Sequence, residues 1–123
     1  MSESRPDGPY GPHILLYRIA RSNPPSEWDM TSHEGRGIPL RFRTARALRR
    51  WSGLSVYTSP IAAVALAVDS PRLGSYIAEL RVALDGTIRM ELNNGEHGHC
   101  TIWGDPRLLL TLVVRVWRTD GVH

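Results

Sequence analysis

The stretch SGLSVYTSPIAAVALA, residues 52–67, most constrains the fold, because a short strand runs directly into a helix of small apolar residues. Ser55 and Tyr57 alternate with apolar residues, which is the period of a β-strand over 54–58. Ser59 and Pro60 are typical of a helix N-cap and first position. The helix over 60–68 is apolar nearly all round, so we expect it to be buried on most sides.

The remaining segments complete an α+β pattern. Asp-Gly at 85–86 lies between two alternating runs, which predicts a hairpin. The predicted order is β-α-α-β-α-β-β-β-α-β, which indicates one α+β domain over 13–119 with a mainly antiparallel sheet and short helices. Residues 1–12 are rich in Pro and Gly and are predicted to be a disordered tail. Further strands are expected over 13–19, 76–84, 88–92, 100–103 and 110–117, and helices over 26–33, 43–51 and from 105–106.

Composition narrows the class of protein. The 123 residues contain no apolar run long enough to span a bilayer, and the polar N-terminus lacks the apolar core of a signal peptide. The single cysteine, Cys100, fits a reducing compartment. We therefore expect a cytoplasmic protein without a membrane partner.

All 15 basic residues are arginines, and five of them lie within ten residues. Arginine binds phosphate with two parallel hydrogen bonds, so this basic patch could bind nucleic acid. The alternative is a solvated helix face, since the 12 acidic residues nearly balance the arginines. The basic patch comprises Arg41, Arg43, Arg46, Arg49 and Arg50.

Two strand residues are candidates for a ligand site. Arg18 lies in an otherwise apolar strand, so it is either an edge residue or a cationic anchor for a phosphate or carboxylate. Ser55 offers little packing between two apolar residues, and Tyr57 shares its strand face. The alternative is that Ser55 is structural.

The segment GEHGHC contains several side chains that could bind metal, but the sequence has no second pair of ligands at zinc-site spacing. We therefore expect no metal site. We also expect Cys100 to be a small buried residue. Glu79 and Glu91 are each expected to pair across the sheet. The metal-like residues are Glu96, His97, His99 and Cys100.

Arg18 in LYRI, followed by GLSVYTSPIAAVALA, GSYIAELRV and HCTIWGDP, resembles the ADP-ribosyltransferase-like superfamily. The run RRWSGLSVYTSPIAAVALA also resembles the RES-domain NAD-degrading toxins, and residues 14–118 resemble small uncharacterised bacterial proteins. The resemblance implies an ADP-ribosyltransferase-like fold with NAD as substrate. Arg18 and Ser55 would hold NAD, and Tyr57 would stack on its nicotinamide or adenine ring.

The chain departs from this superfamily at the catalytic acid, because the usual paired glutamates near the fifth strand are missing. Glu96 or His99 would replace them, Glu79 would reach in, or catalysis is lost. The first hypothesis is an NAD-binding domain, a small toxin or modifying enzyme, that transfers ADP-ribose to an unknown acceptor or cleaves NAD. The alternative is a non-catalytic module that binds protein or nucleic acid through residues 41–50.

Overall fold

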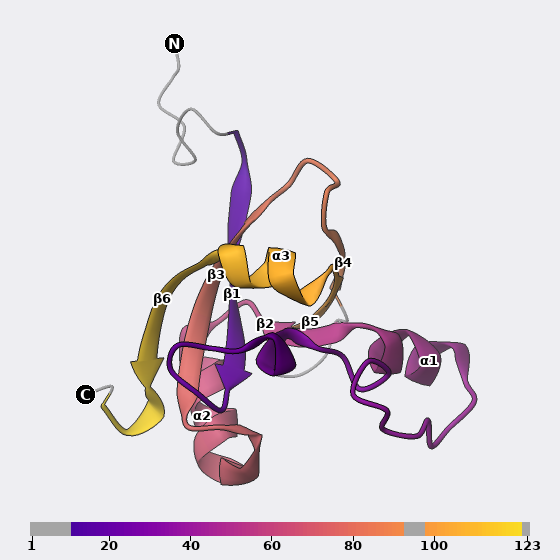
Figure 1. Ribbon diagram of the computed structural model, residues 1–123, viewed down its shortest axis with the longest axis horizontal. Helices are drawn as coiled ribbons and strands as arrows, with labels where there is room; N and C mark the ends of the chain where they lie inside the picture. The colour runs from indigo at the N-terminus through magenta and orange to yellow at the C-terminus, as the bar shows by residue number, and fades with distance from the viewer. Residues whose placement is uncertain (1–10, 93–97, 122–123) are drawn as a thin grey trace.

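Six antiparallel strands form one sheet in the order β4-β5-β2-β1-β3-β6 in the computed structural model, which describes residues 11–92 and 98–121. The two longest strands, β1 and β3, lie side by side in Figure 1 and are in register from His13↔Ala83 to Ala20↔Tyr76. This confirms the α+β class with an antiparallel sheet. The strands are β1 His13–Ala20, β2 Leu54–Tyr57, β3 Tyr76–Ala83, β4 Arg89–Leu92, β5 His99–Trp103 and β6 Val113–Arg118.

Helices cover both faces of the sheet. The 3-10 turn η2 (Glu27–Met30) and helix α3 (Pro106–Thr111) lie on one face, where Met30 and Leu109 are fully buried. Helix α2 (Pro60–Asp69) covers the other face with Ala63 and Ala67. Helix α1 (Ala45–Ser52) lies beyond the β5 side of the sheet (Figure 1). Short 3-10 turns, η3 (Pro71–Leu73) and η5 (Thr119–Gly121), complete the chain.

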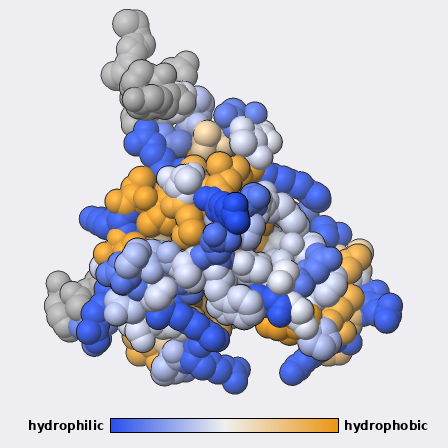
Figure 2. Space-filling model, in the orientation of Figure 1, coloured by the Kyte–Doolittle hydropathy of each residue, from blue (hydrophilic) through white to orange (hydrophobic). Residues whose placement is uncertain are grey.

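Strand alternation divides the core into two clusters. Leu16 packs in the cluster under η2 and α3, whereas Tyr17 and Ile19 pack in the cluster under α2. In Figure 2, hydrophobic residues gather around α3, and the lower part of the same face is mostly hydrophilic. Among the described residues, no helix has the length and apolar character needed to cross a bilayer.

The predicted hairpin between 76–84 and 88–92 is wrong. The turn itself forms, with Gly86 at φ 88° and the Asp85 carboxylate accepting a hydrogen bond from the Thr87 amide. Both edges of β3 are occupied, by β1 and β6, so β4 pairs with β5 at the far edge of the sheet instead.

Two helix expectations also need correction. The helix expected over 26–33 is only the η2 turn. Helix α2 has the expected bounds but is not buried on most sides: Ile61 is 81% and Val68 60% exposed. The segment 110–117 divides between the end of α3 and strand β6.

Candidate functional site

A pocket of about 170 Å³ lies between the end of β1 and the start of β2. Four arginines and a histidine line it, together with Ser55 and Tyr57, and no Asp or Glu belongs to its described lining. The volume is below the roughly 300–1,000 Å³ of most ligand clefts, so the pocket has room for the charged part of a ligand. The cationic residues are Arg18, Arg21, His33, Arg36 and Arg50.

Arg18 connects the two strands that border the pocket. Its Nε donates to the main-chain carbonyl of Asp29 at 2.8 Å, and its Nη1 donates to the carbonyl of Ser55 at 3.0 Å. A guanidinium has five N–H donors, and no other described residue accepts from the remaining three. Arg18 is therefore held rigidly while keeping donors that can bind an anion bidentately.

The η2 turn presents the Asp29 carbonyl to Arg18 because the Asp29 carboxylate fixes the turn. This carboxylate accepts hydrogen bonds from the amide of Arg21 at 2.8 Å, the amide of Ser26 at 2.9 Å and the hydroxyl of Ser22 at 3.0 Å. Burial opposes its charge, but these hydrogen bonds outweigh burial and lower the pKa of Asp29. The Asp29 carboxylate is thus occupied by its own turn.

The arginines of the pocket repel one another. Burial, followed by the nearby charge of Arg36, lowers the pKa of Arg18 to about 10. Arg36 itself donates to the Trp28 carbonyl at 2.7 Å, and its guanidinium lies 5.2 Å from the centre of the Trp28 ring. Burial and the same arginines also lower the pKa of His33. An anion in this pocket would relieve the repulsion.

Ser55, Tyr57 and His99 come together on the face of the sheet that α2 covers. The His99 Nε2 lies 2.9 Å from the Ser55 Oγ, and the His99 ring centre lies 5.5 Å from that of Tyr57. Strand pairing produces this contact, because Tyr57 lies opposite His99 and Ser55 lies opposite Thr101 in the antiparallel β2–β5 pair. The three residues form a polar cluster beside the arginines.

The structure brings together four of the five predicted site residues: Arg18, Ser55 and Tyr57 line the pocket, and His99 contacts two of them. Strand alternation turns the Arg18 and Ser55 side chains to opposite faces of the sheet, so Arg18 reaches the Ser55 carbonyl and not its hydroxyl. The fifth residue, Glu96, lies outside the described residues, as does His97.

The other acidic candidates lie elsewhere. Glu79 does not reach into the pocket: it is 7% exposed and pairs with Arg115 of the neighbouring strand at 3.1 Å, as expected for cross-sheet pairing. Glu91 pairs with Arg49 of the basic patch at 3.2 Å, and because Arg49 lies on α1, the expectation that Glu91 pairs across the sheet is wrong. Cys100 is fully buried, as expected for a small core residue.

The sequence interpretation missed Arg21, His33 and Arg36. All three come from the connection between β1 and α1, which has no hydrophobic period to place its side chains. The only local signal is Arg36 between two glycines, of which Gly37 has φ 77°. The hydrogen bonds that hold this loop, from the Glu34 amide to the Trp51 carbonyl and from the Trp51 ring to the Ile38 carbonyl, are long-range contacts.

Comparisons with known proteins found no match: no protein-family model, curated protein or solved structure matches this chain.

Proposed function

We propose that the chain binds NAD in the pocket between β1 and β2 and acts on the bond between nicotinamide and ribose, releasing nicotinamide and passing ADP-ribose to water or to an acceptor. The observation that carries this proposal is Arg18, which two main-chain carbonyls hold while three of its N–H donors have no partner among the described residues. A guanidinium in that position binds a phosphate oxygen pair.

The chemistry of the pocket fits a dinucleotide diphosphate. Arg18, Arg21, Arg36 and Arg50 carry four formal positive charges, and the described lining holds no carboxylate to oppose an anion. The Tyr57 ring at the same pocket can stack on a nicotinamide or adenine ring. Because the pocket is small, we assign the diphosphate of NAD to it. The rest of NAD would lie along α1 and the β2–β5 face. This agrees with the resemblance to ADP-ribosyltransferase-like enzymes, in which an arginine and a serine on strands hold NAD.

Isothermal titration with NAD tests the binding, and chromatography of the same mixtures tests nicotinamide release. We expect Arg18→Gln to weaken NAD binding by about 10- to 100-fold, since it removes a charge-assisted hydrogen bond that contributes roughly 1.5–3 kcal/mol. Arg118→Gln is the matched control, because Arg118 lies on β6 and pairs with Asp120 at 2.9 Å, away from the pocket. Equal NAD affinity in both variants, or no binding by the wild type, would contradict the proposal.

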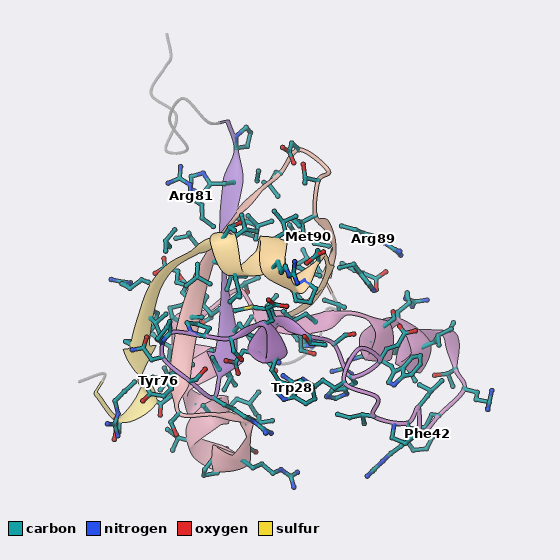
Figure 3. All side chains as sticks on the ribbon, viewed as in Figure 1. Trp28, Phe42, Tyr76, Arg81, Arg89 and Met90 are labelled. Atoms are coloured by element: carbon teal, nitrogen blue, oxygen red, sulfur yellow. The ribbon has the colours of Figure 1, made fainter. Side chains whose placement is uncertain are left out.

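A second candidate function, nucleic-acid binding, rests on the exposed part of the basic patch. Figure 3 shows Phe42 at the outer end of the loop that leads into α1, and its side chain is 69% exposed between Arg41 and Arg43. Arg41, Arg43 and Arg46 are exposed and have no acidic partner among residues 11–92 and 98–121. An exposed aromatic among cations can stack on a base.

A gel shift with single-stranded RNA over a salt series distinguishes the two functions. Nucleic-acid binding requires that affinity fall steeply as salt rises and that Arg43→Gln reduce that dependence, while Arg18→Gln leaves it unchanged. No binding at low salt eliminates this candidate.

A further inference from the structure

Ser55 and His99 form a pair with the geometry of a nucleophile and its base. Their Oγ and Nε2 atoms are 2.9 Å apart, within the range for proton transfer. The pair joins two strands: Ser55 is on β2 and His99 on β5, with a hydrogen-bonded ladder between them. Ser55 lines the arginine pocket together with Tyr57, whose side chain is on the same face of β2 as the Ser55 hydroxyl.

The surroundings of His99 keep its ring neutral. The side chain is 7% exposed, and burial, reinforced by the charge of Arg50, lowers its pKa to about 4. At neutral pH the imidazole is therefore uncharged and can accept a proton through Nε2 when Nδ1 carries the hydrogen. Diphosphate binding beside Arg50 would offset that charge and make the ring more basic.

This pair can supply two of the groups that cleavage of NAD requires. Nicotinamide is a cationic pyridinium in NAD and leaves as a neutral base, so no general acid has to protonate it. The reaction needs a group that attacks the ribose C1′ and a group that takes the proton from the attacking atom. The described lining of the pocket offers no carboxylate for the first role, but it offers the Ser55 hydroxyl.

We propose that Ser55 is a nucleophile that accepts ADP-ribose covalently, with His99 as its base; this inference rests on the proposed function. The Ser55 Oγ forms a bond to C1′ as the C1′–N bond breaks, and that bond's electron pair leaves with neutral nicotinamide. The Oγ proton passes to His99 Nε2. In the second step water or an acceptor hydroxyl attacks C1′ and releases the serine oxygen, which takes back the proton from His99 while the attacking oxygen gives its own proton to solvent.

Mass spectrometry of the protein after incubation with NAD and a rapid acid quench tests this step. We expect the mass of one ADP-ribosyl group on the peptide that contains Ser55, and no such adduct in Ser55→Ala. Because the Ser55 carbonyl, not its hydroxyl, holds Arg18, Ser55→Ala keeps the arginine that binds the diphosphate and should still bind NAD in the titration. Thr58→Ala removes a neighbouring exposed hydroxyl and should leave the adduct on Ser55.

His99 has its own readouts. His99→Gln should slow adduct formation by about 10²- to 10⁴-fold, the usual effect of removing a general base. In the wild type, the rate of adduct formation should fall as pH is lowered and His99 is protonated. A rate that does not change with acidification overturns the role of His99.

Parallel titration and nicotinamide assays separate this inference from the proposed function. Nicotinamide release without an adduct on Ser55, with Ser55→Ala releasing at the wild-type rate, overturns the nucleophile and leaves NAD cleavage standing. An adduct on a different residue also overturns it. Absence of NAD binding overturns both.

Discussion

At the scale of single residues, Arg18 is the feature that most needs a functional explanation. Its pKa is lowered to about 10, so it is still charged at neutral pH, but burial and Arg36 make that charge less stable in the fold than in the unfolded chain. A folded-state pKa below the unfolded one means that the charge of Arg18 costs stability at neutral pH. An anionic ligand would remove this cost.

We predict that pyrophosphate stabilises the wild type and has little effect on Arg18→Gln. A ligand that binds only the folded state stabilises it by about 2.7 kcal/mol at 100 times its Kd, which corresponds to a rise in Tm of roughly 8–13 °C for a domain of this size. Thermal unfolding with pyrophosphate, against sodium chloride of equal ionic strength, measures the effect. An equal rise in both proteins would place the anion elsewhere.

The lowered pKa of His99 predicts that the stability of the fold depends on pH. Its pKa is 6.5 when unfolded and about 4 in the fold, so between these values the unfolded chain binds more protons. The free energy of unfolding should therefore be highest above pH 6.5 and fall as pH is lowered toward 4. His99→Gln should make this fall shallower in urea titrations, with a residual slope of the same sign from His33, whose pKa is also lowered. An unchanged slope would show that His99 is not responsible.

At the scale of elements, helix α2 shows what local sequence determines. The Ser59 side chain accepts a hydrogen bond from the Ala62 amide at 3.2 Å, and Pro60 occupies the first turn, as its sequence predicts. The same local rules place the turn at Asp85-Gly86, yet they predict the wrong partner for β4. Caps and turns depend on neighbours in sequence, whereas strand partners depend on which sheet edges remain open.

We predict that Ser59→Ala lowers the free energy of unfolding by about 1 kcal/mol, the usual cost of losing an N-cap. Ser59→Asp should retain most of the stability, because a carboxylate accepts the same hydrogen bond and favours a helix N-terminus. Thr58→Ala, one residue earlier and exposed, is the control and should change stability by less than about 0.5 kcal/mol. Urea unfolding measures all three, and equal losses for Ser59→Ala and Thr58→Ala would contradict the capping role.

The candidate site follows the same rule as helix α2 and the turn: its local features are predictable from the sequence, and its long-range partners are not. The strand period correctly predicts Ser55 and Tyr57 on one face. The alternative that Arg18 is an edge residue is wrong, because β1 lies between β2 and β3 and Arg18 is held by hydrogen bonds. Its partners are main-chain carbonyls of Asp29 and Ser55, 11 and 37 residues away, and every residue has such a carbonyl. No side-chain pattern in a sequence identifies them.

At the scale of the whole molecule, the sheet consists of two halves with a weak join. All eight residues of β1 pair with β3, but β1 and β2 share a single register pair, Tyr17↔Tyr57. Beyond that pair the Arg18 guanidinium supplies the link to β2. The core cluster under η2 and α3 spans both halves, so they unfold together while the join itself can open locally.

We predict that hydrogen exchange shows this join directly. Amides of residues 76–83 should exchange slowest, because β3 is paired on both edges, and those of residues 53–57 should exchange faster through local opening. Arg18→Gln should speed exchange at 53–57 and leave 76–83 unchanged, whereas Arg118→Gln should alter neither the join nor β2. ADP-ribose should slow exchange at 53–57 in the wild type alone, since its diphosphate would join Arg18 to the cations of the other half. A uniform change across both halves would mean that Arg18 contributes to global stability and not to the join between β1 and β2.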